Sequence, residues 1–484
     1  MMLQKISRLL IITAGLTLLA ACTVGPDYVK PSAEVPVAYK EMADWKKAQP
    51  QDNIIKGRWW EIFNDHQLNA LEAQVNISNQ NIAVAEAQFR QAQALVREAR
   101  AGYFPTVTTG ASATRARAES NFNGQSAVSI VSNFSLPADI SWEPDVWGRI
   151  RRTVEAAQAN AQASAADLEA ARLSAQSALA QDYFQLCALD QEKHLLDTTV
   201  IKFQKSLDLT KNRYDNGVAS KADVLLSETQ LKTTEAQAID IGVQRSQLEH
   251  AIALLIGKPA SDFSIPVSPL AALPPDIPAG VPSELLERRP DVAAAERLMV
   301  AANAQIGVAE AAFYPNITLS ASGGFQSTDI SKWLRWPSRF WSVGSSISET
   351  VFDAGLRSAM TAQARAAYDA SVASYRQTVL TGFQEVEDNL AALRILEQEA
   401  SVQDEAVKAA QQTVVVLTNQ YKAGTVSYLD VIVTQAAELS DEKTAVNILG
   451  RRMSASVLLI EALGGGWNTS GMCVSPTVPV SRQR

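Results

Sequence analysis

The chain has 484 residues and a formal net charge of −8. Its length allows several domains, and its acidity argues against nucleic acid as a partner. Three cysteines are present; Cys187 and Cys473 are far apart in sequence, and we expect no structural disulfide.

Residues 1–21 have the pattern of a secretory signal peptide, with a basic start, a short apolar stretch and small residues before Cys22. The end of this segment, LAAC, resembles a bacterial lipobox, in which the cysteine thiol receives a diacylglyceryl group and the new amino terminus is acylated. The alternative is a plain signal peptide followed by an accidental cysteine. We expect a covalent lipid, with acyl chains such as palmitate, on Cys22 and no other cofactor. By analogy with known lipoproteins, Thr23 after the cysteine favours the outer membrane.

Two copies of one unit follow the leader. Residues 81–112 align with 291–322, and residues 139–149 align with 346–356. The residue pattern of each copy predicts, in order, a helix, a strand, a loop, a strand, a very long helix, a turn and a helix. The expected parts are an N-terminal segment (22–64), the first copy (65–257), a Pro-rich crossover (258–283), the second copy (284–464) and a C-terminal tail (465–484).

The helices of each copy differ in length by about a factor of two. The stretches 149–214 and 355–421 lack proline and predict helices of roughly 65 residues, or about 100 Å. Residues 68–101 and 222–256 are each about half as long, so two such helices stacked end to end would match one long helix. The second copy repeats this arrangement, with Pro290 opening its first helix after a possible cap at Ser283. We expect a tall helical cylinder; a plain coiled-coil stalk is the alternative.

The strand regions, about 104–142 and 315–352, alternate apolar and polar residues. Each strand has the length that a tilted strand needs to cross a bilayer, and tryptophans lie near the strand ends. A soluble sandwich with one wet face is the alternative. Four strands cannot close a barrel alone, so chains in a membrane would have to share one, and three copies supply twelve strands. The predicted apolar positions are Val128, Ile130, Phe134, Leu136, Ala138, Ile140 and Trp142, then Ile317, Leu319, Ala321, Phe325, Trp341, Val343 and Ile347.

The long helices end in two matching turns, 214–223 and 421–430, which are 207 residues apart. Gly217 and Gly424 supply the freedom in φ that a tight turn requires. Ser220 and Ser427 are placed to cap the helices that follow.

Several long motifs carry a family resemblance. Residues 281–324 (VPSELLERRPDVAAAERLMVAANAQIGVAEAAFYPNITLSASGG) are similar to the signature segment of TolC-like outer-membrane efflux channel lipoproteins, the outer components of tripartite resistance-nodulation-division pumps. CTVGPDYVKP, RWWEIFND, WEPDVWGRIRR and EALGGGW also resemble that family. The resemblance covers nearly the whole chain after the leader.

The resemblance implies an α+β membrane protein in the outer membrane of a Gram-negative bacterium. It implies a homotrimer with a twelve-stranded transmembrane β-barrel continuous with a long periplasmic α-helical barrel, and an irregular equatorial belt holding the crossover and the tail. Such channels are passive exit ducts for drugs and other small molecules and contribute to antibiotic resistance. The implied partners are a periplasmic adaptor (membrane fusion protein), an inner-membrane pump and outer-membrane lipid.

The resemblance also assigns roles at the two turns, which it places at the periplasmic tip. It implies a gate near Tyr421, Leu429 and Asp430, with Asp223 in the first copy. Many relatives have a second acid where this chain has Val433, so we expect a thin acidic ring. The adaptor-docking tip comprises Tyr214, Gly217, Val218, Ser220, Gly424, Thr425, Val426 and Ser427.

Catalytic and metal-binding patterns are absent from the sequence. The three histidines are far apart, and the glycines at 464–466 are better interpreted as a helix C-cap than as a phosphate loop. We therefore expect no enzyme. A channel for protein secretion and a periplasmic coiled-coil scaffold remain the alternatives.

Overall fold

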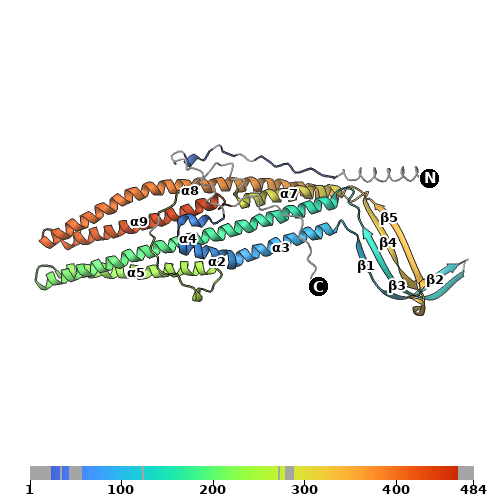
Figure 1. Ribbon diagram of the computed structural model, residues 1–484, viewed down its shortest axis with the longest axis horizontal. Coiled ribbons are helices and arrows are strands. Elements are labelled where there is room, and N and C mark those ends of the chain that lie inside the picture. The colour runs from blue at the N-terminus through green and yellow to red at the C-terminus, as the bar shows by residue number, and fades with distance from the viewer. Residues whose placement is uncertain are drawn as a thin grey trace. The chain divides into compact units, whose positions relative to one another are not determined.

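The computed structural model describes residues 23–32, 35–36, 38–42, 57–122, 125–270, 273–277 and 288–466 (Figure 1). The predicted leader, Cys22, Ser283 and the tail from residue 467 lie outside the described residues. The chain divides into two compact units. We call Met1–Pro31, Phe89–Ala163 and Ala295–Tyr375 the strand unit, and Ser32–Gln88, Ser164–Ala294 and Arg376–Arg484 the helix unit.

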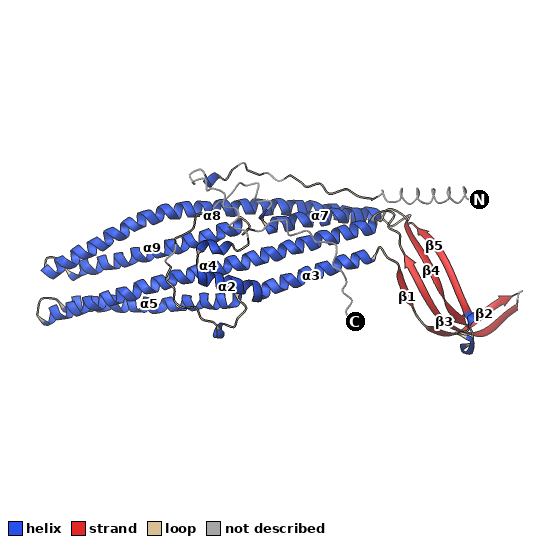
Figure 2. Ribbon diagram, viewed as in Figure 1, coloured by secondary structure: helices blue, strands red, loops and turns tan. Residues whose placement is uncertain are grey.

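Helices occupy most of the described chain (Figure 2). The predicted long helices are confirmed: α4 has 67 residues and α8 has 68, each about 100 Å long. No helix in the described ranges is long and apolar enough to cross a membrane. The helices are α2 (His66–Ser78), α3 (Gln80–Ala101), α4 (Arg149–Asp215), α5 (Lys221–Leu255), α7 (Pro290–Ala311), α8 (Leu356–Ala423) and α9 (Tyr428–Ala462).

The strand unit contains one antiparallel sheet in the order β1-β3-β4-β5, and β2 continues the pairing of β1 along β3. The first copy was expected to contain two strands, but its first strand is divided into two pieces at Gly110. The reason lies in Pro137, the residue opposite the break, which has no N–H to donate to the ladder. The strands are β1 (Thr106–Thr109), β2 (Ser112–Phe122), β3 (Gln125–Trp142), β4 (Asn316–Ser327) and β5 (Arg339–Ser348).

The register of the sheet confirms the predicted apolar face between β3, β4 and β5. Residues directly opposite each other in an antiparallel pair project from the same face. Trp341 is 81% exposed, Ile140, Val343 and Ile347 are also exposed in the single chain, and Leu136 and Phe325 are half-buried. A face of this kind requires a non-aqueous surrounding. The opposed pairs are Trp142–Leu319, Ile140–Ala321, Leu136–Phe325, Ala321–Val343 and Ile317–Ile347.

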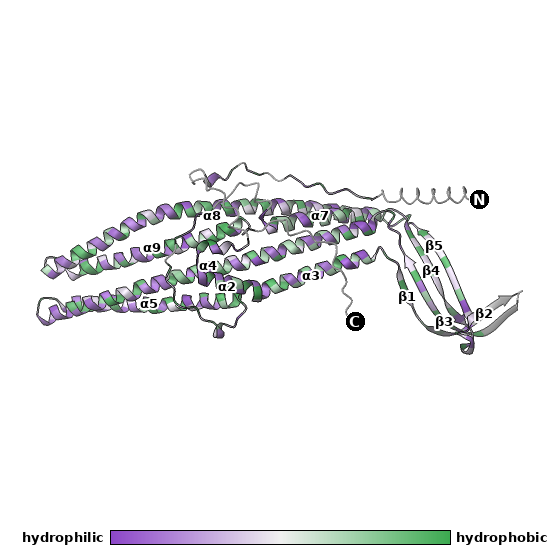
Figure 3. Cartoon of the chain, viewed as in Figure 1, coloured by the Kyte–Doolittle hydropathy of each residue, from purple (hydrophilic) through white to green (hydrophobic). Residues whose placement is uncertain are grey.

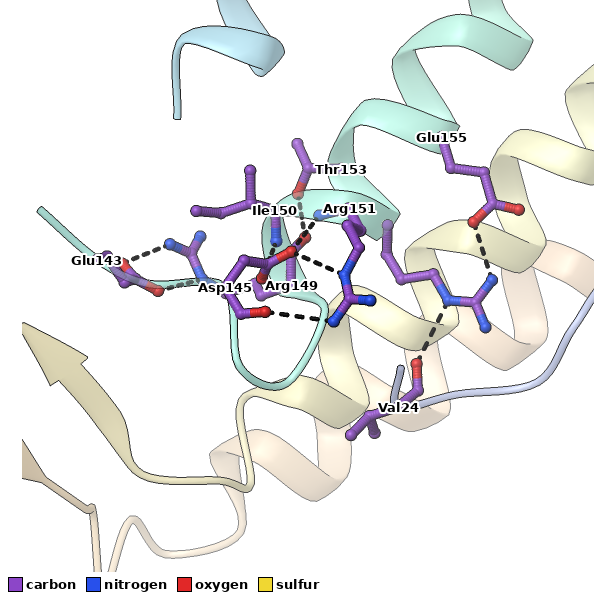
Figure 4. A network of polar contacts seen from close by, with 9 residues as sticks. Val24, Glu143, Asp145, Arg149, Ile150, Arg151, Thr153 and Glu155 are labelled. Atoms are coloured by element: carbon purple, nitrogen blue, oxygen red, sulfur yellow. Dashed lines mark hydrogen bonds and ion pairs between the residues drawn. The ribbon is translucent and has the colours of Figure 1, made fainter. Parts of the chain in front are cut away.

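The motif WEPDVWGRIRR joins β3 to α4 (Figure 4). The Asp145 carboxylate accepts hydrogen bonds from the backbone N–H groups of Ile150 (2.9 Å) and Arg151 (2.8 Å), which satisfies free donors in the first turn of α4. Arg149 forms a two-pronged ion pair with Glu143, at 3.1 and 2.7 Å. These contacts fix the direction in which the long helix leaves the sheet.

In the helix unit, the short helices stack end to end as expected. Asn79 donates from its side-chain amide to the carbonyl of Leu255 (2.7 Å), and Ser78 donates from its hydroxyl to the carbonyl of Ile256 (2.6 Å). In the second copy, Arg289 donates to the carbonyl of Ala462 (3.2 Å) just before α7. The last carbonyls of α5 and α9 are thereby satisfied by side chains at the start of α3 and α7.

The prediction of one continuous helix over residues 68–101 is wrong. Asn79 has an extended backbone and separates α2 from α3. Its side-chain oxygen accepts from the N–H groups of Asn81 (2.9 Å) and Ile82 (3.1 Å), so the residue caps α3 while its amide group bonds α5.

The described part of the crossover packs on the long helix α4. The N–H of Leu270 donates to the carbonyl of Cys187 (3.2 Å) in α4, and the N–H of Ser268 donates to Asp190 (2.9 Å). Burial raises the pKa of the Cys187 thiol to about 12, so this side chain remains neutral beneath the crossover.

Candidate functional site at the helix tips

The two predicted tip turns have the same backbone geometry. Gly217 and Gly424 have φ of 75° and 80°, and open space surrounds the position of an added Cβ at each. The residue after each glycine donates its N–H back into the preceding helix: Val218 to Arg213 (2.8 Å) and Thr425 to Gln420 (3.0 Å). Both turns therefore end their helices with a left-handed glycine that satisfies otherwise free carbonyls.

Both predicted serine caps are confirmed, and each is part of a reciprocal capping box. Ser220 pairs with Asp223 at the start of α5, and Ser427 pairs with Asp430 at the start of α9. The Asp430 carboxylate accepts from the backbone N–H of Ser427 (3.0 Å) and from its hydroxyl (2.7 Å). The two aspartates predicted at the gate thus also hold the first turns of their own helices.

Tyr428 connects the two copies at the tip, and the sequence analysis did not identify it as a site residue. Its side chain is 3% exposed, and its hydroxyl lies 2.9 Å from the hydroxyl of Ser206 in α4. The same Tyr428 hydroxyl donates to Ser227 in α5 at 2.8 Å. One phenol therefore holds the start of α9 against both helices of the first copy.

A difference between the copies could have revealed this residue. The position that matches Tyr428 in the first copy is 428 − 207 = 221, which is Lys221. A charged residue after one capping serine and an aromatic residue after the other indicates that only the second turn packs against a neighbour. Without the structure, nothing identified Ser206 or Ser227 as its partners.

Tyr421 lies in the same cluster. It is 4% exposed, its ring centroid is 5.1 Å from that of Tyr428, and the guanidinium of Arg213 lies 4.6 Å from its ring centroid. Arg213 also donates to the carbonyl of Lys422 (3.2 Å). Burial raises the pKa of Tyr421, so this phenol stays neutral at physiological pH. Its counterpart in the first copy, Tyr214, is instead 43% exposed.

The remaining tip residues divide into a packed and an exposed set. Val426 packs against the cluster formed by Tyr421, Tyr428 and Val431. Leu429 is 53% exposed, and Val218 and Val433 are also exposed. The exposed apolar and acidic residues are thus free to contact other chains. The exposed predicted residues are Tyr214, Gly217, Val218, Ser220, Gly424, Thr425, Ser427, Leu429 and Asp430, and Asp223 is half-buried.

Helices α4 and α5 form one hairpin and helices α8 and α9 form the second. Ion pairs also join these two hairpins further along the helix unit. Lys443 in α9 lies 2.9 Å from Glu192 in α4, and Lys202 in α4 lies 3.8 Å from Glu438 in α9. Such pairs are partly exposed and contribute little individually, on the order of 1 kcal/mol or less. The buried tyrosine cluster is therefore the more specific contact between the hairpins.

Comparison with known proteins identifies the family. The sequence model described as "Outer membrane efflux protein" matches residues 71–258 and again 281–465, one match for each copy of the repeat. The chain belongs to the outer membrane efflux protein family. Its fold is that of an outer-membrane channel, and it serves as the exit duct of an efflux system in the outer membrane.

Three relatives illustrate the match. The solvent efflux pump outer membrane protein SrpC of Pseudomonas putida is 31% identical over 464 residues, which cover 94% of this chain and 98% of SrpC. A structure of the outer-membrane channel OprN has a TM-score of 0.86 at 31% identity, covering 92% of this chain and 100% of OprN. A structure of the open state of the Neisseria gonorrhoeae MtrE outer membrane channel has a TM-score of 0.80 at 27% identity, covering 92% of this chain and 98% of MtrE.

Replacing Tyr428 with Phe should loosen the tip while keeping its packing. The substitution removes both hydrogen bonds of the hydroxyl, each worth about 1 kcal/mol, and leaves the ring beside Tyr421. Amide hydrogen exchange at residues 421–431 should accelerate by roughly 30-fold, which corresponds to about 2 kcal/mol. Tyr214→Phe, at the exposed counterpart of Tyr421, should leave the exchange unchanged. Equal exchange in both variants would show that the hydroxyl does not hold the tip.

Proposed function

We propose that three copies of the chain form a passive duct for small molecules through the outer membrane of a Gram-negative cell. The observation that carries this proposal is the sheet, which has an exposed apolar face and two free edges. Among the described strands, β5 pairs only with β4, and β1 and β2 pair only with β3. Lipid offers no hydrogen bonds to such edges, and joining three four-stranded sheets removes every edge.

We further propose that the helix tips close the duct. In a threefold assembly, Leu429 and Asp430 from three chains would surround one axis, with Asp223 on the neighbouring turn. The buried tyrosines support this role, because they hold the second hairpin against the first and would have to separate for the hairpin to move outward. An open state has been solved for the related MtrE channel.

The partners proposed for the tip are a periplasmic adaptor and, through it, an inner-membrane pump of the resistance-nodulation-division class. SrpC is itself named as part of an efflux pump. The exposed turns carry a small protruding apolar surface, Val218 in one copy and Leu429 in the other. We propose no catalytic activity for the chain. A duct for protein secretion is the second candidate, but no contact among the described residues favours it.

A lipid on Cys22 would anchor the assembly at the membrane surface. The segment after Cys22 is held at the junction between β3 and α4, where the N–H of Val24 donates to the carbonyl of Trp147 (3.1 Å). The buried guanidinium of Arg152 donates to the carbonyls of Val24 (3.3 Å) and Gly25 (3.2 Å). These bonds support the anchor because they fix the chain next to Cys22 at the end of the strands.

Asp430→Asn should increase single-channel conductance and weaken block by divalent cations, because it removes a ring of negative charge from a constriction. Asparagine keeps a side-chain oxygen that can accept from Ser427, so the helix cap is retained. Asp430→Ala removes the charge together with the side-chain acceptor of the capping box, and so separates the two effects. If only the alanine variant alters conductance in planar bilayers, the cap rather than the charge ring sets the gate.

Gly424→Trp should abolish efflux while leaving the trimer intact. The turn is exposed and is not part of the sheet, but a side chain there must adopt a positive φ and would obstruct a docking partner. Gly242→Trp is the matched control, because Gly242 lies in the middle of α5 with open space around it. Drug susceptibility and gel detection of the trimer provide the measurements. Wild-type efflux by the Gly424 variant would exclude the tip as the docking surface.

Cys22→Ser should yield a protein without lipid. Intact-mass measurement should detect the acyl groups on the purified wild-type protein and on the control variant Cys473→Ser, which keeps Cys22. An unmodified Cys22 in the wild-type protein would contradict the proposed anchor.

A further inference from the structure

The hairpin of β2 and β3 extends beyond the rest of the sheet. The pairing of β3 with β4 ends at Phe134 and Ser327, whereas β2 remains paired with β3 as far as Phe122 and Gln125. This end of the sheet also carries the connection between β4 and β5, residues 328–338. It is the end of the strands opposite to the one that leads into α4 and α8.

Three arginines lie on the apolar face at this end. Arg115 is opposite Ser132 in β3, and Arg117 is opposite Ile130. Ser132 and Ile130 are even-numbered positions of β3, so they project from the same face as Phe134, Leu136 and Ile140. Arg339 is opposite Phe325, which is itself opposite Leu136. The face that carries apolar residues along the middle of the strands therefore carries guanidinium groups at their far end.

Aromatic rings accompany these arginines. The guanidinium of Arg339 lies 3.1 Å from the ring centroid of Trp336, and its Nε donates to the carbonyl of Trp336 (3.0 Å). The ring of Trp333 lies 5.9 Å from that of Phe134, so the connection packs onto β3. Tryptophan and arginine together are typical of the level at which lipid headgroups meet hydrocarbon.

Basic residues outnumber acidic residues at this end of the sheet: Arg115, Arg117, Lys332, Arg335 and Arg339 against Glu119 and Asp329. Arg115, Arg117 and Arg335 have no ion-pair partner among the side chains that the structure describes. Residues 327–339 contain a single acid, Asp329, which lies 3.8 Å from Lys332. Figure 3 shows hydrophilic residues at this connection. An unpaired guanidinium that faces lipid is costly, so an anion at this depth would stabilise it.

We propose that Arg115, Arg117 and Arg339 bind the phosphate groups of the phosphorylated glycolipid in the outer leaflet of the membrane. Arginine suits this ligand because its planar guanidinium donates two parallel hydrogen bonds to a phosphate. Phosphate monoesters on a sugar carry more charge than the phosphodiester of an ordinary phospholipid. The inference rests on the proposed function, which places the helices in the periplasm and this end of the strands outside.

The test is titration of the purified, detergent-solubilised channel with lipid A, followed by native mass spectrometry. Each basic residue near an anionic lipid surface contributes roughly a factor of five to ten in affinity, so the triple variant Arg115→Gln, Arg117→Gln, Arg339→Gln should bind at least about 100-fold more weakly. The control replaces Arg90, Arg97 and Arg100 with Gln on the exposed side of α3, at the other end of the strand unit, and should bind like the wild type.

Two further probes identify the ligand chemistry. Wild-type channel should bind dephosphorylated lipid A and phosphatidylglycerol much more weakly than lipid A. Equal binding of lipid A by the two triple variants, or equal binding of phosphatidylglycerol and lipid A by the wild type, would overturn the proposal. Conductance in bilayers free of lipid A tests the proposed channel separately. All variants should conduct there, and a wild-type protein without conductance would contradict the duct and not the lipid site.

Discussion

The structure depends on the requirement that every backbone N–H and C=O within lipid must find a partner. The sheet of one chain cannot meet this requirement, because β5 and the β1–β2 strand each leave one edge unpaired among the described strands. Its apolar face is equally unsuited to water. Joining copies edge to edge removes the first defect, and lipid around the joined sheets removes the second, so the chain is best understood as one segment of a closed wall.

The internal repeat builds this segment from two copies of one unit. The tip contact that we link to gating is found where the two copies differ. Both turns use a left-handed glycine followed by a reciprocal Ser–Asp capping box. The side chains around them have diverged. Tyr421 is buried whereas Tyr214 is exposed, and Tyr428 replaces a lysine. Two identical turns would reverse two helices equally well, but only the second is fastened to its neighbour. Because this contact joins the two hairpins to each other, neither can move away at the tip until the hydrogen bonds of Tyr428 break.

The sequence predicted features that depend on local periodicity and on single residues with special backbone properties. The apolar face follows from period-two alternation, and the turns follow from Gly217, Gly424 and their capping serines. It did not predict contacts between residues far apart in the chain. The break at Asn79 reflects its bond to Leu255, 176 residues away, and the link from Tyr428 to Ser206 spans 222 residues. The interruption between β1 and β2 depends on Pro137 in the opposing strand.

A cryo-electron microscopy map of the channel in lipid nanodiscs tests the central claim most directly, because it resolves the sheet edges. We predict threefold symmetry, with β5 of each copy hydrogen-bonded along its free edge to the β1–β2 edge of the next copy in a wall of twelve strands. A particle in which a single copy crosses the bilayer, or in which the β5 edge faces lipid unpaired, would contradict the account.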